Sequence, residues 1–131
     1  GEETRIVGGA VRNAILGFPD TDVDLTTTAL PERTRALAEA AGFKAVPTGI
    51  EHGTLTLIVG GEPYEVTTLR EDVETDGRHA VVRFGRDFPT DARRRDFTIN
   101  ALALGADGVV HDAVGGLRDL AARRVVFIGD P

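Results

Sequence analysis

The chain has 131 residues, enough for one domain with a buried core and too few for a second full domain. Hydrophobic residues make up 41% and charged residues 27%, which excludes a disordered, collagen-like or wholly membrane-embedded chain. The absence of cysteine excludes disulfides, thiolate catalysis and cysteine-bound metals, and three widely spaced histidines argue against a zinc site. A net charge of −6 is not that of a basic nucleic-acid-binding domain.

No apolar run approaches the roughly 20 residues of a membrane helix, so we expect no membrane partner. No signal or transit segment is evident, and the expected compartment is therefore the cytoplasm. The chain contains no methionine and opens on Gly1, so we expect that Gly1 is not the natural start.

The first half of the chain predicts strands and helices separated by glycine and proline turns. Strands are expected at 4–7, 22–27, 43–46, 54–59 and 64–69, and helices at 10–16 and from Pro31 to Gly42. Gly60-Gly61 joins the last two strands in a predicted hairpin.

The second half begins with residues 70–90, which are charged, contain glycine and lack periodicity, and which predict a long mobile loop. A short helix capped by Thr90 or Asp91 then runs through the arginines. Strands at 99–104, 109–111 and 125–128 and a helix at 117–122 follow. Mixed strands and helices without regular alternation predict an α+β fold with a mixed sheet of about five or more strands.

Gly8-Gly9 follows the first strand and opens a helix that carries Arg12 about one turn in. Glycines there let backbone N–H groups approach an anion, and the helix N-terminus favours negative charge. Arg12 could then reach a phosphate oxygen. Taken alone, the pair is more typical of a tight strand–helix turn with a solvated arginine.

Asp22 and Asp24 alternate with Val23 on a predicted strand, so both carboxylates point to one face. Such a pair repels unless a cation lies between its members, and Mg²⁺ prefers carboxylates completed by substrate phosphates. Glu65 lies opposite the core residue Val66 on its own strand and would add a third carboxylate if that strand neighbours 22–27. The alternative for the aspartates is a polar strand face or a pair that caps a turn, and the alternative for Glu65 is an exposed strand residue.

The segment Arg93-Arg94-Arg95-Asp96-Phe97-Thr98-Ile99-Asn100 combines donors and acceptors suited to ribose hydroxyls and phosphates. An arginine beside an aspartate also suggests an orienting ion pair. A run of charges is more usually a solvated face, so this segment alone decides nothing.

Together, Gly-Gly-Ala-Val-Arg, Asp-x-Asp, Glu-Val-Thr-Thr and Arg-Arg-Asp-Phe-Thr-Ile-Asn-Ala resemble the head of class II tRNA nucleotidyltransferases, the CCA-adding enzymes. Bacterial poly(A) polymerases share this head. The resemblance extends from Arg5 to Pro131. It implies a polymerase-β-like nucleotidyltransferase head that spans residues 1–131 and that is followed, in the family, by a neck, body and tail.

The resemblance implies roles for specific residues. Asp22 and Asp24 would hold Mg²⁺ and act catalytically, with Glu65 as the third carboxylate. The residues expected to bind the nucleotide are Gly8, Gly9, Arg12, Arg95, Asp96 and Asn100. The implied reaction adds C and A from CTP and ATP to the 3′ end of tRNA, and the 70–90 segment would assist the switch from C to A.

One departure from the family pattern is Asn13, where an aspartate is usual after the arginine of the first motif. Asparagine still accepts a hydrogen bond, so we expect nucleotide binding to survive. The base-reading neck and the tRNA-binding parts are absent from these 131 residues. Poly(A) addition, and a non-catalytic Mg–NTP-binding module, are therefore the alternatives.

Overall fold

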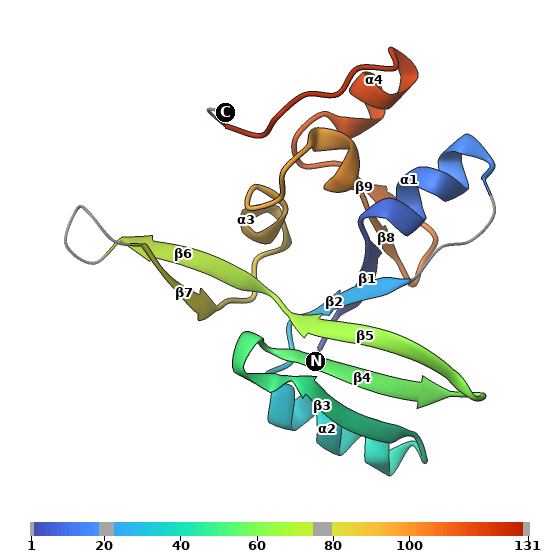
Figure 1. The fold of residues 1–131 in the computed structure, drawn as a ribbon, viewed down its shortest axis with the longest axis vertical. Helices are drawn as coiled ribbons and strands as arrows, with labels where there is room; N and C mark the ends of the chain where they lie inside the picture. Colours follow the sequence, from blue (N-terminus) through green and yellow to red (C-terminus); the bar gives the residue numbers. More distant parts are fainter. Residues whose placement is uncertain (1, 19–22, 75–79, 130–131) are drawn as a thin grey trace.

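The computed structural model describes residues 2–18, 23–74 and 80–129, and the fold is given for these residues. Seven of their strands form one mixed sheet, in the order β3-β4-β5-β2-β1-β8-β9 (Figure 1). These strands are β1 Thr4–Val7, β2 Asp24–Thr27, β3 Lys44–Gly49, β4 Thr54–Val59, β5 Glu62–Thr68, β8 Ala103–Gly105 and β9 Val110–His111. A separate hairpin pairs β6 Arg70–Glu74 with β7 Ala80–Phe84.

The helices of the described residues are short. They are α1 Gly9–Leu16, α2 Pro31–Ala40, α3 Phe88–Ala92 and α4 Gly116–Ala121, with 3-10 turns η1 Ile50–His52 and η2 Thr98–Asn100. None of them has the length and apolar character of a membrane span.

We call the face of the sheet that α1 and α2 cover the back face. Under α1, Ile6 and Leu104 pack around the buried residues Val11 and Leu102. Under α2, the sheet contributes Leu25, Leu57 and Val66 among others. Helices α1 and α2 therefore cover the same side of the sheet, and the core lies between them and the strands.

The opposite side, which we call the front face, carries the charged residues Asp24 and Glu65, together with the buried Val7 and Thr26 under α3. Strand alternation puts Arg5 and Val7 of β1 there, together with Asp24 and Thr26 of β2. Because β2 and β5 are parallel, Asp24 is the direct partner of Glu65. The short helix α3 lies over the β1 side of this face, where the Arg5 guanidinium stacks 3.8 Å from the centre of the Phe88 ring.

The α+β class, the mixed sheet and the hairpin at Gly60-Gly61 agree with expectation. The strand expected at 22–27 is present as β2 from Asp24, while Asp22 lies outside the described residues.

The prediction of a loop over 70–90 was wrong for residues 70–74 and 80–84 and for the helix that begins at Phe88, and it holds for residues 85–87. Residues 70–74 and 80–84 pair as β6 and β7, and residues 75–79 lie outside the description. The β6–β7 ribbon pairs only with itself, so it shows little of the apolar alternation by which a half-buried strand is found.

The short helix was misplaced. It begins at Phe88, is capped by the Asp87 carboxylate, which accepts from the Thr90 N–H at 3.0 Å, and ends at Ala92, before the arginines. An aspartate followed by proline in the first turn is the signal that was missed.

The strands expected at the C-terminal side were too long. Residues 98–100 form η2 and only Ala103–Gly105 forms β8, while 125–128 contributes a single bridge, Phe97 to Phe127. The apolar residues of the predicted strand over 99–104 pack in the core with Val11 and Leu120, but Ile99 does so from η2 and not from a strand.

Candidate functional site

The site begins where β1 ends. Gly8 is buried, has φ +78° and precedes the first turn of α1, and its N–H donates to the Leu102 carbonyl at 3.2 Å. This left-handed backbone lets the chain turn directly from strand to helix. A side chain at Gly9 would lie 3.3 Å from an Arg12 nitrogen. The N-terminus of α1 therefore faces the Arg12 guanidinium with no side chain between them.

The Arg12 guanidinium is held by two side chains. Its Nη1 donates to Asn100 Oδ1 at 2.6 Å, and its Nε donates to Asn13 Oδ1 at 3.1 Å. The expectation that Asn13 still accepts a hydrogen bond beside Arg12 is therefore confirmed. Asn100 comes from η2, 88 positions further along the chain.

Asp96 extends this network. Its Oδ1 accepts from the Phe97 N–H at 2.7 Å and from Asn100 Nδ2 at 3.2 Å. The Phe97 N–H, together with the Asn100 amide and nearby Arg95, holds the pKa of the Asp96 carboxyl below its usual range. Asp96 is thus an exposed, ionised acceptor next to the group that orients Arg12.

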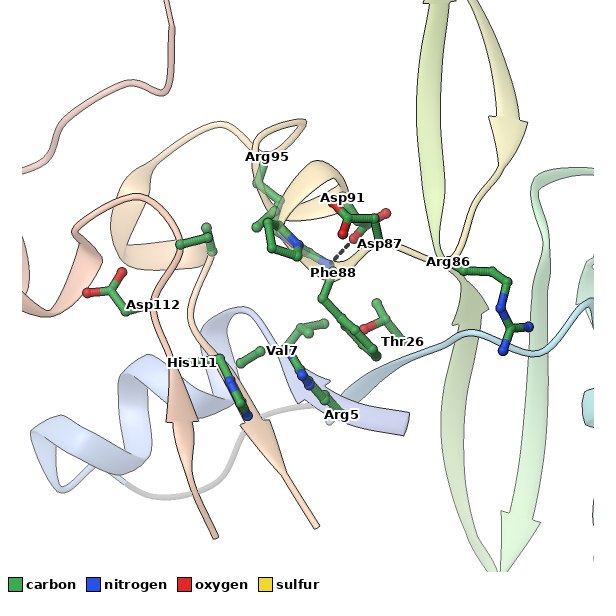
Figure 2. A pocket seen from close by; sticks show the side chains of 15 residues that line it. Arg5, Val7, Thr26, Arg86, Asp87, Phe88, Asp91, Arg95, His111 and Asp112 are labelled. Carbon is green, nitrogen blue, oxygen red and sulfur yellow. Dashed lines mark ion pairs between the residues drawn. The ribbon is translucent and has the colours of Figure 1, made fainter. Parts of the chain in front are cut away.

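Arg95 lies beside the glycine turn, because its Nη1 is 3.8 Å from the position that a Cβ atom at Gly8 would occupy. It also pairs with Asp91 at 3.6 Å, as Figure 2 shows. The two residues border a pocket of about 430 Å³ between α3 and the front of β1 and β2. The predicted nucleotide-binding residues therefore gather around the N-terminus of α1.

Asp24 and Glu65 lie next to this group. Asp24 is paired with Val7, the residue before Gly8, and on its other side with Glu65. Both carboxylates are exposed, and neither makes an ion pair within the described part of the chain. The condition set for Glu65, that its strand neighbours 22–27, is met.

The donor set fits a divalent cation. Two acceptor-only carboxylates on adjacent strands of one face repel each other, and hard cations such as Mg²⁺ prefer such oxygens. Among the described residues, no three histidine, aspartate or glutamate side chains form a group that could hold a metal ion. Asp22 lies outside the described residues. The roles assigned to Asp22, Asp24 and Glu65 remain predictions.

One residue of the site was missed as such. Asp91 was expected only as a helix cap, yet it is 6% exposed, pairs with Arg95 and accepts from the Arg70 N–H at 2.9 Å. It thus joins the start of the β6–β7 hairpin to Arg95. The spacing of four residues between Asp91 and Arg95, across one helical turn, was the signal available in the sequence.

Comparison with known proteins matches residues 4–126 to a family described as the poly A polymerase head domain. The chain is 48% identical over 128 residues to CCA tRNA nucleotidyltransferase 1, mitochondrial, from Danio rerio, covering 97% of this chain and 30% of that protein. It is 43% identical over 132 residues to a CCA-adding enzyme from Bacillus cytotoxicus, covering 99% of this chain and 32% of that protein.

Solved structures agree. The crystal structure of the Bacillus stearothermophilus CCA-adding enzyme in complex with CTP superposes with a TM-score of 0.84 at 39% identity, over 98% of this chain and 30% of that one. A tRNA nucleotidyltransferase complexed with a primer tRNA and an incoming ATP analog gives 0.71 at 35% identity, over 92% of this chain and 34% of that one. The chain thus spans about a third of the length of the proteins it matches.

Proposed function

The chain belongs to the family of poly(A) polymerase head domains, and from this membership and the site geometry we propose that it is the head of a CCA-adding tRNA nucleotidyltransferase. The proposed reaction is attack of a tRNA 3′-hydroxyl on the α-phosphate of CTP or ATP, with release of pyrophosphate. One observation carries it: Asp24 and Glu65 lie side by side, next to the glycine turn that Arg12 and Asn100 border.

The protein's part is mostly positioning and neutralisation of charge. The N-terminus of α1 and Arg12 would hold the triphosphate, whose negative charge the helix end and the guanidinium both favour. Asn100 holds Arg12 in place, and the ionised Asp96 offers an acceptor to a ribose hydroxyl. Arg95, kept beside Gly8 by Asp91, adds a second cation at the turn.

Asp22 and Asp24, with Glu65, would hold Mg²⁺, which when bound activates the attacking hydroxyl and neutralises charge on the leaving pyrophosphate. Holding that cation requires carboxylates that are accessible and free of internal ion pairs. The exposed positions of Asp24 and Glu65 support this requirement.

The catalytic assignment is tested by Asp22→Ala in the protein carrying its tRNA-binding parts. Because the carboxylates act as one cation site, nucleotide incorporation should fall by several orders of magnitude while the melting temperature is kept. Near-normal incorporation would remove the assignment.

Poly(A) addition is the second candidate, favoured by the description of the matching family. Incubation with tRNA lacking its 3′ end, and with CTP and ATP separately, decides between the two. Incorporation of CTP excludes a pure poly(A) polymerase.

The third candidate is a non-catalytic Mg–NTP-binding module, which applies to these 131 residues by themselves. Calorimetry with CTP, ATP and GTP tests it. We expect weak binding with little preference among bases, since the chain spans only about a third of the length of the proteins it matches. The cytoplasm stays the proposed compartment; some relatives are named mitochondrial, so cell fractionation must test it.

A further inference from the structure

The front face of β3, β4 and β5 carries a group of hydroxyls, which we call the threonine face. Its members are Thr48, Thr54, Thr56 and Thr67. Across the strands, the hydroxyls of Thr54 and Thr67 are 2.9 Å apart, and those of Thr48 and Thr56 are 2.8 Å apart. These cross-strand pairs hold the hydroxyls in a fixed array.

The threonine face is continuous with the carboxylates. Thr56 is the direct partner of Glu65, and Glu65 is the direct partner of Asp24. Thr67 follows Glu65 by two positions and therefore lies on the same face of β5. A molecule lying across these threonines would have its end at Asp24 and Glu65.

This surface is accessible and nearly neutral. Its threonines are half-buried or exposed, whereas Leu55 and Val66 on the back of the same strands are 0% and 6% exposed. A hydroxyl bonded to one neighbour keeps further capacity to donate or accept. The surface therefore offers hydrogen bonds in both directions, as ribose hydroxyls and phosphate oxygens require, without a strong field of its own.

The geometry also gives the direction of approach. The proposed triphosphate groups, Gly8 and Arg12, lie on the β1 side of Asp24, while β5 and β4 lie on the opposite side. In-line transfer needs the attacking hydroxyl and the leaving pyrophosphate on opposite sides of the reacting phosphorus. An attacking strand that reaches the carboxylates over β5 and β4 meets this requirement.

We propose that the threonine face binds the last nucleotides of the acceptor RNA strand, with its hydroxyls bonded to ribose 2′-hydroxyls and phosphate oxygens. This assignment rests on the proposed function and adds the surface used by the second substrate. Because the 2′-hydroxyl is what distinguishes RNA from DNA, the threonine face selects RNA.

The test uses amide NMR of this chain, titrated with a single-stranded RNA trinucleotide, with its 2′-deoxy analogue, and separately with Mg–CTP. The variant is Thr54→Val/Thr67→Val, which removes both partners of one hydrogen bond and keeps their shape, a change close to neutral for stability. The control is Thr4→Val/Thr27→Val, a hydroxyl pair 3.1 Å apart near α2 on the back face. Because Thr27 Oγ1 also accepts from the Ala29 N–H at 3.2 Å, this variant should lose some stability. Melting temperatures verify that both variants fold.

We expect RNA to shift the amide resonances of residues 54–56 and 65–67, and we expect the deoxy analogue to bind more weakly. The Thr54→Val/Thr67→Val variant should lose about fivefold in RNA affinity. The control variant should bind RNA with the affinity of the parent. In both variants the amide response of residues 8–12 to Mg–CTP should be that of the parent. The proposal would be overturned if the variant bound RNA as tightly as the parent, if RNA shifted amides on another surface, or if RNA did not bind. It would also be overturned if the shifts at 54–56 depended only on protein concentration, as binding of a second copy would cause. Absence of a response to Mg–CTP would instead count against the proposed function.

Discussion

Arg12 shows how a single side chain is prepared for its ligand. A free arginine side chain loses up to about 2 kcal/mol of rotamer entropy when it is ordered. Here the hydrogen bonds to Asn100 and Asn13 have already ordered the guanidinium. A phosphate that binds Arg12 therefore need not bear that cost.

Arg12→Lys is predicted to weaken Mg–CTP binding about tenfold. Lysine keeps the positive charge, but it has no planar fork to bond Asn100 and Asn13 and a phosphate together. Calorimetry measures the loss. Arg33→Lys, at an exposed position on α2, is the matched control and should bind as the parent does. Equal affinity in both variants would show that Arg12 contributes charge alone.

Asp96→Asn is predicted to change the acid dependence of stability. The Phe97 N–H and the Asn100 amide lower the pKa of the Asp96 carboxyl in the folded protein. A lowered pKa contributes stability that is present above the unfolded value of about 3.9 and is lost as the pH falls through the folded value. The parent should therefore exceed the variant in unfolding free energy at pH 7, and the difference should shrink in acid.

Urea unfolding at a series of pH values measures this difference. Asp107→Asn, an exposed aspartate in the turn between β8 and β9, serves for comparison. A difference between parent and Asp96→Asn that stays constant down to acid pH would contradict the prediction.

At the scale of elements, the position of Asn100 depends on α4. The buried carboxylate of Asp119 accepts from the Thr98 hydroxyl at 2.6 Å and pairs with Arg124 at 3.0 Å. Gly116, also on α4, lies so close to η2 that a side chain there would collide with the Thr98 carbonyl oxygen. The packing of α4 on η2 thus determines where Asn100 stands relative to Arg12.

Gly116→Ala is predicted to destabilise the fold by about 3 kcal/mol or more, because backbone on both sides must separate to admit the methyl group. The shift of η2 should also weaken Mg–CTP binding. Chemical denaturation and calorimetry test the two effects. Gly49→Ala, where the nearest atom would be 3.4 Å away, is the control and should cost much less. Tolerance of Gly116→Ala would mean that α4 and η2 are not closely coupled.

For the whole molecule, the binding site joins segments from both ends of the chain. β1 and α1 supply the turn, β2 and β5 supply carboxylates, and η2 supplies Asn100. A ligand that contacts all of them binds the folded state only, and so stabilises it.

Mg–CTP at about ten times its dissociation constant should contribute ~1.4 kcal/mol, which raises the melting temperature by about 4 °C in a domain of this size. Asp24→Asn should abolish the part that depends on Mg²⁺. Thermal unfolding with CTP, with and without EDTA, measures both. An equal rise in EDTA would show that the metal does not contribute to binding.

The sequence was sufficient for the local features. The strand–glycine–helix turn, the hairpin at Gly60-Gly61 and the α+β class follow from residue type and spacing, because turn chemistry and side-chain alternation act over a few residues. For the same reason it was clear that Asp24 and Glu65 lie opposite the core residues of their strands.

Only the tertiary structure decided which of these faces meet. The parallel pairing of β2 with β5 puts Glu65 beside Asp24, the packing of η2 brings Asn100 to Arg12, and the buried Asp91 links Arg95 to the β6–β7 hairpin. Alternation determines the face on which a side chain lies but not the neighbour of its strand. That neighbour is determined by how the whole apolar surface is buried at once, a condition that involves residues far apart in the chain.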